Sequence, residues 1–167
     1  MKHLYLLLLL ATTTIHAQDT LRFSSRSTGN IQITYVGSVS AGKANGNGKV
    51  KFKNGTSYEG AWKDNEIIGY GKMTYYNGDV YDGDFSYALK HGRGTFKAKG
   101  NYTYNGDWKN DLMDGKGTLK YDSGDEVYGD FENGKLNGRA DIKWRNGKKY
   151  SGQVRDYKFH GKGTLQY

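Results

Sequence analysis

The feature that most constrains this chain is a 23-residue period that runs through most of its length. Six equivalent positions, each 23 residues after the one before, carry Tyr35, Tyr58, Tyr81, Tyr104, Val127 and Tyr150. A glycine follows each of them by two residues, and a bulky apolar residue follows that glycine by two more. Eleven residues into each unit stands a second glycine, and a third glycine follows it by two residues in every unit except the fifth. Such a period indicates a repeat architecture in which each unit packs on its neighbours.

Within each unit, apolar or glycine positions alternate with polar ones, which predicts two short β-strands. Asn-Gly pairs at 54–55, 77–78 and 146–147 and a Ser-Gly pair at 123–124 predict the turns between units. In the third unit Gly100 comes one residue early and Asn101 stands where glycine is expected, but both residue types tolerate left-handed backbone. Because the rings on both sides of a turn must share one face, we expect a three-residue loop with glycine as the left-handed residue.

The alternation of rings with glycines predicts a specific kind of packing. The chain has 25 glycines and 15 tyrosines, and few aliphatic residues outside its first ten positions, so aromatic rings must supply most of the burial. We expect a ring on one strand to lie over the bare backbone of the next, with Phe85 across from Gly71 or Gly69. Glycine weakens a strand by roughly 0.5–1 kcal/mol relative to alanine, and burial of a ring more than offsets this cost.

The predicted fold class is all-β: one elongated, twisted antiparallel meander of β-hairpins whose concave face carries the aromatic and glycine residues. Its six units are residues 35–57, 58–80, 81–103, 104–126, 127–149 and 150–167. At about 4.8 Å per strand the array would extend roughly 55–60 Å, and strand twist would curve it into a trough. Residues 18–34 do not match the unit; Leu21–Arg26 and Ile31–Tyr35 predict a lead-in hairpin that caps the first edge.

The N-terminus has the order of a secretory signal peptide: Lys2, an apolar run from Leu4 to Ala11, then small and polar residues up to Ala17. The run is shorter than the roughly 20 residues that a membrane span needs. We therefore predict cleavage after residue 17 and export to the periplasm, the outer envelope or the medium, with an uncleaved membrane tether as the alternative. Because the chain has no cysteine, no disulfide would support the exported fold.

At this point the pattern resembles a known family. Each unit is similar to the MORN repeat (membrane occupation and recognition nexus), whose pattern is Tyr-x-Gly-x-(Trp/Phe) followed, after six further residues, by Gly-x-Gly. Residues 58–71, 81–94 and 104–117 match every fixed position of this pattern. The departures, for which we expect softer packing at the ends and in the fifth unit, are Val39, Val127, Ala140 and Val154. The resemblance, over residues 35–167, implies an elongated hairpin array that mediates protein–protein contacts and oligomerisation, and the family has been credited with phospholipid binding.

The residues offer little for catalysis. Only His91 and His160 follow the predicted signal peptide, three repeats apart and so about 29 Å apart along the sheet, too far to share a metal ion. The Gly-x-Gly motifs lead into strands rather than helices and are not phosphate loops. We therefore predict no enzyme activity, no cofactor, no metal and no small-molecule substrate.

The net charge of +8 becomes +7 once Lys2 is removed with the signal peptide. Acidic residues recur on first strands and basic residues on second strands, which predicts cross-strand ion pairs on a solvated face. As an alternative, the basic residues would contact an anionic phospholipid or cell-envelope surface. The candidates for that contact are Arg93, Lys97, Lys116, Lys120, Arg139, Lys143 and Lys162. Nucleic acid is an unfavoured partner for an exported chain.

Most rings are needed for structure, but the centre of the aromatic face would leave some edges open to a peptide, a helix or a sugar. The candidates there are Tyr75, Tyr81, Phe85, Tyr104, Trp108 and Tyr121. Because Tyr167 lies within a predicted strand, an unpaired edge would also allow end-to-end dimerisation. The favoured function is a non-enzymatic exported scaffold that binds a protein partner or itself; the alternatives are the anionic surface above and an aromatic carbohydrate-binding surface.

Overall fold

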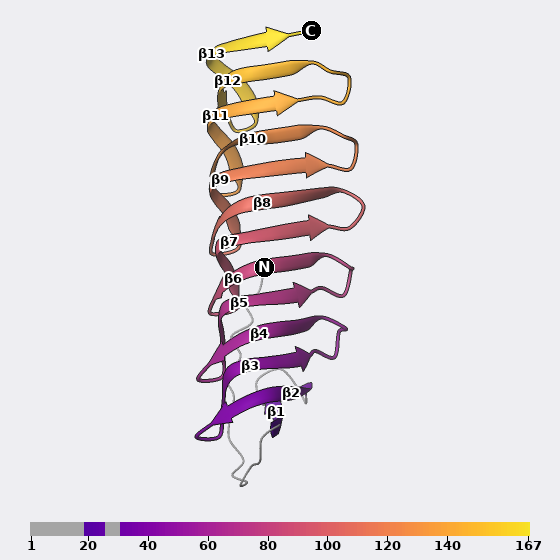
Figure 1. Ribbon diagram of the computed structural model, residues 1–167, viewed down its shortest axis with the longest axis vertical. Helices are drawn as coiled ribbons and strands as arrows, with labels where there is room; N and C mark the ends of the chain where they lie inside the picture. The colour runs from indigo at the N-terminus through magenta and orange to yellow at the C-terminus, as the bar shows by residue number, and fades with distance from the viewer. Residues whose placement is uncertain (1–18, 26–30) are drawn as a thin grey trace. The chain divides into compact units, whose positions relative to one another are not determined.

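The computed structural model describes residues 19–25 and 31–167, so the predicted signal peptide at residues 1–17 lies outside the described residues. The described chain is all β, an open antiparallel sheet of thirteen strands that follow one another in chain order (Figure 1). The predicted all-β meander of hairpins is therefore confirmed. The described residues contain no helix with the length and hydrophobicity that a membrane crossing needs.

The strands are β1 (Asp19–Ser25), β2 (Ile31–Ser40), β3 (Lys43–Lys51), β4 (Ser57–Lys63), β5 (Glu66–Thr74), β6 (Val80–Ser86), β7 (Leu89–Ala98), β8 (Tyr102–Lys109), β9 (Leu112–Tyr121), β10 (Glu126–Glu132), β11 (Lys135–Lys143), β12 (Lys149–Arg155) and β13 (Lys158–Gln166). They form two compact units: the first holds the described residues up to Gly78 together with Asp84–Ala88, and the second holds Asp79–Gly83 and Leu89–Tyr167.

In the first unit, β1 pairs with β2 from Asp19 opposite Gly37 to Ser25 opposite Ile31. Strand β2 continues to Ser40 and also pairs with β3. The tyrosine that leads the first repeat therefore lies in the middle of a strand that serves both hairpins.

The turns between repeats are three-residue loops. At residues 53–55 the Phe52 N–H donates to the Thr56 carbonyl at 2.8 Å and the Gly55 N–H donates to the Phe52 carbonyl at 2.9 Å, with Gly55 at a φ of 91°. This confirms the predicted loop length and its left-handed glycine. In the third repeat Ala98 still lies opposite Tyr102, but Gly100 takes the positive φ of 69°, one residue earlier than glycine does elsewhere.

The turns within repeats are two residues long, and both residues have positive φ, as in a type I′ turn. Asp64 and Asn65, with φ of 51° and 72°, are residue types that tolerate this conformation. The third repeat instead places Tyr87 and Ala88 there, at 50° and 62°. A bulky side chain at positive φ is uncommon and strained.

The two glycines of Gly-x-Gly serve different purposes. Strand β4 pairs with β5 at Gly60 and Gly71 and again at Trp62 and Ile67, so the register shifts between these two pairs and β5 bulges. The first glycine lies in this bulge with a positive φ, 95° at Gly69, as does its counterpart in every repeat. The second glycine leaves room for a ring.

The ring that fills this space belongs to the leading tyrosine of the same repeat. A Cβ built on Gly71 would lie 2.6 Å from Tyr58 Cζ, and one on Gly60 would lie 2.5 Å from the Tyr58 hydroxyl oxygen. The alternative in which Phe85 lies over Gly71 is therefore wrong, because Tyr58 fills that space. In the equivalent registers, the aromatic four residues after the leading tyrosine lies opposite the first glycine of the preceding repeat, as Trp62 does at Gly46.

The leading tyrosines and these aromatic residues pack edge to face along each unit. The Tyr104 ring lies 5.1 Å from that of Trp108 in its own repeat and 5.1 Å from that of Phe131 in the next, both T-shaped. The buried Tyr104 hydroxyl donates to the Asp107 carbonyl at 3.0 Å, and burial raises the pKa of this phenol. The Trp108 indole N–H donates to the Gly94 carbonyl at 3.1 Å, so both polar groups are satisfied within the core.

Candidate functional site

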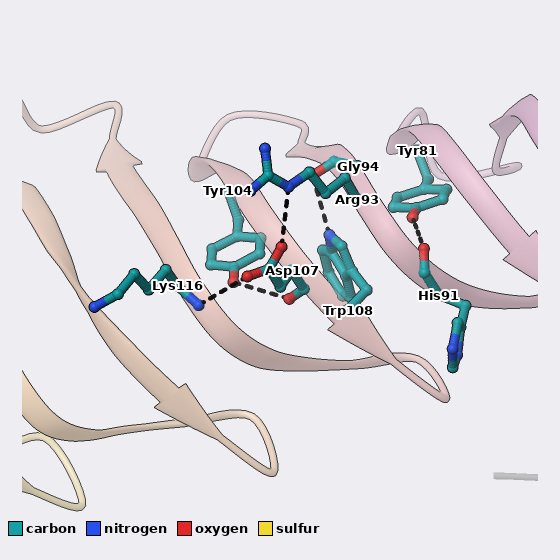
Figure 2. Close-up of polar contacts among 8 residues, drawn as sticks. All are labelled: Tyr81, His91, Arg93, Gly94, Tyr104, Asp107, Trp108 and Lys116. Atoms are coloured by element: carbon teal, nitrogen blue, oxygen red, sulfur yellow. Dashed lines mark hydrogen bonds and ion pairs between the residues drawn. The ribbon is translucent and has the colours of Figure 1, made fainter.

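The predicted site on the aromatic face is mostly interior. Tyr81, Phe85, Tyr104 and Trp108 are buried, and the expectation that their edges are open to a ligand is wrong for these four. Tyr81 and Tyr104 are buried because they lie in glycine slots. Phe85 and Trp108 are buried because they pack edge to face against the leading tyrosines Tyr58 and Tyr104. Figure 2 shows Tyr104 and Trp108 beside each other, with the Trp108 N–H directed at the Gly94 carbonyl.

Tyr75 and Tyr121, the other two predicted residues, are half-buried. Both occupy the same position of their repeats, at the end of the second strand, and Trp144 occupies it in the fifth. The third repeat has Ala98 there, and Tyr102 lies opposite it with its ring 6.2 Å from that of Tyr121. Burial raises the pKa of both Tyr102 and Tyr121.

The outward face carries the predicted ladder of cross-strand ion pairs. Lys49 pairs with Glu59 at 2.8 Å in the first unit. In the second unit Arg93–Asp107, Lys116–Asp130 and Lys120–Glu126 pair at 3.3, 2.8 and 3.2 Å. The partners lie directly opposite each other on adjacent strands, so the ion-pair interpretation is confirmed for these residues.

The carboxylates also have a role that the sequence analysis missed. Asp107 Oδ1 contacts Arg93 Nε of β7, while Asp107 Oδ2 accepts the backbone N–H of Lys116, which follows the bulge glycine of β9, at 3.1 Å (Figure 2). Asp130 accepts the equivalent N–H of Arg139 at 3.2 Å. The recurrence of aspartate three residues after the leading position was the available signal. The side chain thus stabilises the bulge as well as the charge ladder.

The ladder changes towards the C-terminus of the second unit. The residue equivalent to Asp107 and Asp130 is Gln153 in the sixth repeat, which accepts the Lys162 N–H at 3.1 Å but carries no charge. Lys143 lies opposite Lys149 on β12, although on its other side it lies opposite Glu126 of β10. Residues 139–167 contain eight lysines and arginines against two acids. The predicted basic residues Lys97, Arg139, Lys143 and Lys162 are all exposed, and the last three lie in this segment.

A hollow of about 380 Å³ lies on the same unit. It is lined by side chains and backbone of Thr118, Glu126, Val127, Tyr128, Asp141, Ile142, Lys143, Lys149, Tyr150, Ser151, Thr164 and Gln166. Three aliphatic hydroxyls, two phenols, two carboxylates, two ammonium groups and an amide belong to these lining residues. None of its residues except Lys143 was predicted as a site residue.

Lys90 is a second feature that the sequence analysis missed. Its position, nine residues after the leading tyrosine, is otherwise apolar, with Ile67 and Leu136 as examples. The Lys90 side chain is only 14% exposed, and its Nζ lies 5.0 Å from the centroid of the Trp108 ring and 3.5 Å from Asp111 Oδ1. A cation–π contact and an ion pair together compensate the charge in this position.

His91 and His160, the histidines of the described residues, belong to no group that could hold a metal ion. His91 and His160 are both exposed, and in Figure 2 the His91 imidazole points away from Tyr81, whose hydroxyl donates to the His91 carbonyl at 3.3 Å. Among the described residues no three His, Asp or Glu side chains are grouped so that they would hold a metal ion.

The repeated hairpins, with their buried rings and polar outer rows, define a β-hairpin repeat protein. The model of the MORN repeat matches residues 35–57, 58–80, 81–102, 104–126, 128–149 and 150–167. The chain therefore belongs to the MORN-repeat family, as the resemblance predicted. Members of this family are generally non-catalytic and take part in interactions with proteins or membrane lipids.

Proposed function

We propose that the protein is a non-enzymatic, exported MORN-repeat scaffold that binds a protein partner through exposed tyrosines. Tyrosine is enriched at protein interfaces because it supplies a large, rigid contact area with a polar end. Six tyrosines of the described chain are exposed even though the core has a place for this residue in almost every repeat. They are Tyr70, Tyr76, Tyr87, Tyr128, Tyr157 and Tyr167.

Tyr87 gives the strongest support to this proposal. It is 67% exposed and has a φ of 50°, so it bears backbone strain while burying little of its ring. Asn110 and Asn133 occupy the same turn position in the next two repeats, which shows that the fold is served by a residue that tolerates left-handed backbone. Strain at an exposed aromatic residue supports a role in binding rather than in stability.

Tyr70 supports the same role. It is exposed on β5 between the two glycines of Gly-x-Gly, where the following repeats have the basic residues Arg93 and Lys116. An exposed aromatic residue in a charged column lowers solubility without adding to the core. Binding of a partner would offset that cost.

The test is capture of envelope proteins on the immobilised chain, residues 18–167, compared with Tyr87→Asn and Tyr70→Lys. Both substitutions install residues that other repeats carry at these positions. We expect each variant to reduce capture of a specific partner at least tenfold, and Tyr87→Asn to raise the thermal midpoint because it relieves strain. Asn110→Asp, at the same turn position, is the matched control and should leave capture unchanged. Equal capture by all four proteins would refute the tyrosine surface.

Self-association is a second candidate, favoured by strand β13. This strand pairs with β12, and Phe159, Leu165 and Tyr167 in this region are exposed. Pairing with a second copy would cover them and extend the sheet. Light scattering of residues 18–167 should then show a dimer that Phe159→Lys disrupts, whereas a monomer at high concentration would rule the dimer out.

Export is part of the proposal and rests on the N-terminal pattern alone. Expression of the full chain should yield a periplasmic or secreted product whose intact mass corresponds to residues 18–167. An unprocessed product in the cytoplasm would contradict it.

A further inference from the structure

We infer that the hollow over β9–β13 is a binding site for an acidic oligosaccharide, a polyhydroxylated chain that carries carboxylate groups. The inference goes beyond the proposed protein scaffold and uses none of the residues tested for it. It rests on the geometry of two rows of side chains, on the chemistry of these rows and on a pair of lysines that lie opposite each other within the hollow.

The hollow lies along two adjacent rows that cross five strands, and all residues of these rows except Lys120 line it. Residues directly opposite on neighbouring strands share a face, so each row follows from the register. One row is Lys120, Glu126, Lys143, Lys149 and Gln166, and the other, two residues along each strand, is Thr118, Tyr128, Asp141, Ser151 and Thr164. At about 4.8 Å per strand each row spans roughly 19 Å, the length of several sugar rings in line.

The second row suits sugar hydroxyls. Thr118, Ser151 and Thr164 each offer a hydroxyl that donates and accepts hydrogen bonds, and the Asp141 carboxylate accepts them. Tyr128 is 49% exposed, and its ring would supply an apolar surface for the C–H face of a sugar. Convergence of a few polar groups with an aromatic residue in a hollow of this size is typical of ligand sites.

The first row supplies the preference for an anion. Lys143 lies directly opposite Lys149. In earlier repeats the same pair of positions holds Lys97 opposite Thr103 and Lys120 opposite Glu126. Like charges opposite each other destabilise a sheet, and the two earlier repeats hold threonine or glutamate in place of the second lysine. A ligand carboxylate between the two ammonium groups would replace their repulsion with two charge-assisted hydrogen bonds.

The same lining argues against a simple polyanion. Glu126 pairs with Lys120 at 3.2 Å, and Asp141 lies in the middle of the second row, so two carboxylates face whatever enters the hollow. A phosphate polymer offers these carboxylates no hydroxyl donor to offset the repulsion, whereas the hydroxyls of an acidic sugar chain would donate to them. An acidic oligosaccharide satisfies both the lysine pair and the carboxylates.

The test is calorimetric titration of residues 18–167 with an oligogalacturonate of about six units. A neutral maltooligosaccharide, inorganic polyphosphate and anionic vesicles serve as comparison ligands. We expect the oligogalacturonate to bind and Lys143→Thr and Lys149→Thr each to lower its affinity about tenfold. Tyr128→Ala should lower it by a similar factor through loss of the ring. Lys97→Thr makes the same chemical change in the third repeat, outside the hollow, and should alter affinity less than twofold.

Several outcomes would overturn the inference. One is no heat with oligogalacturonate at millimolar concentration. Another is a loss with Lys97→Thr as large as that with Lys143→Thr, which would mean non-specific attraction to basic residues. Stronger binding of polyphosphate or vesicles that survives Tyr128→Ala would assign the face to a simple polyanion. Thermal unfolding of each variant shows whether it is folded, and Lys143→Thr, which copies Thr74 at the same position of the second repeat, keeps the test valid if Tyr128→Ala fails to fold.

Discussion

The fourth and fifth repeats solve one packing problem in two ways. In the fourth repeat the fully buried Tyr104 ring lies over the cross-strand pair Gly106 and Gly117, and a Cβ on Gly117 would lie 2.5 Å from Tyr104 Cζ. In the fifth repeat the leading residue is Val127, and the cross-strand pair is Gly129 and Ala140. The valine leaves the space above the pair free of a ring, and a methyl group occupies it.

Leu136 fills the remaining space in the core of the fifth repeat. It is buried, and its Cδ1 would lie 3.0 Å from a Cβ on Gly129, where a leading tyrosine places its ring in other repeats. Ala140 is only 1% exposed, so the region is closed. The softer packing expected here is not reflected in burial. The leading tyrosine ring and the second glycine of Gly-x-Gly are therefore coupled. Where the leading residue has no ring, a residue with a Cβ fits at the glycine position.

The substitution with the largest expected effect on this difference between the two repeats is Gly117→Ala. The new Cβ would overlap the Tyr104 ring, which has no room to move because Trp108 and Phe131 contact it on either side. Overpacking of this kind typically costs 1–3 kcal/mol, and we expect a loss of about 3 kcal/mol in the free energy of unfolding measured with urea. Asn105→Ala, an exposed change on β8, is the control and should leave stability nearly unchanged. A Gly117→Ala protein as stable as this control would disprove the slot.

A double substitution sharpens the comparison. Tyr104→Val together with Gly117→Ala gives the fourth repeat the residues of the fifth. The double variant should lose less free energy than the sum of its two single variants, by about 1–2 kcal/mol, because valine removes the clash that the new methyl group creates. Urea unfolding of the unsubstituted protein, the two single variants and the double variant completes this double-mutant cycle. Additive effects would mean that Val127 and Ala140 occur in one repeat without any coupling.

The reverse change in the fifth repeat should have a smaller effect. Ala140→Gly removes one buried methyl group and gives a strand residue more freedom in the unfolded state, for an expected loss of about 1 kcal/mol. The same substitution should stabilise a Val127→Tyr protein, because it reopens the glycine slot for the new ring. Thermal unfolding of both pairs measures this, and an equal loss in the two backgrounds would argue against the slot.

The sequence was sufficient to predict the fold because its period, its turn glycines and its alternating rings all indicate the same hairpin. It did not show which ring covers which glycine, since Tyr81 and Phe85 lie on the same face of a strand and only the register separates their roles. That ambiguity also led four core rings to be predicted as a binding surface.

The site was less predictable for a related physical reason. Ion pairs such as Lys116–Asp130 follow from alternation along two adjacent strands, which a sequence shows directly. The hollow depends on side chains from five strands, and its residues depart from the repeat one at a time. The departures at Lys149 and Gln153 are recognised only when equivalent positions are compared across all the repeats.

The smallest expected effect concerns charge and separates Asp130 from its uncharged counterpart Gln153. Hydrogen bonding from Lys116 holds the pKa of Asp130 below its usual range, and the Arg139 N–H contributes in the same direction. A depressed carboxyl pKa stabilises the fold above the pKa of the unfolded chain, near 3.9, and this contribution is lost as pH falls through the folded value. The same pair raises the pKa of Lys116, whose contribution is present below its unfolded pKa and lost as pH rises through the folded one.

Asp130→Asn keeps an oxygen for the Arg139 N–H, as Gln153 does for Lys162, but removes the charge. We expect a lower urea midpoint than that of the unsubstituted protein at pH 7, by less than Ala140→Gly causes, because the pair is exposed and screened by salt. As pH falls through the folded pKa of Asp130, the two midpoints should converge, since protonation removes the same charge from Asp130. A difference that stays unchanged throughout the acid range would show that the charge of Asp130 contributes nothing to the fold.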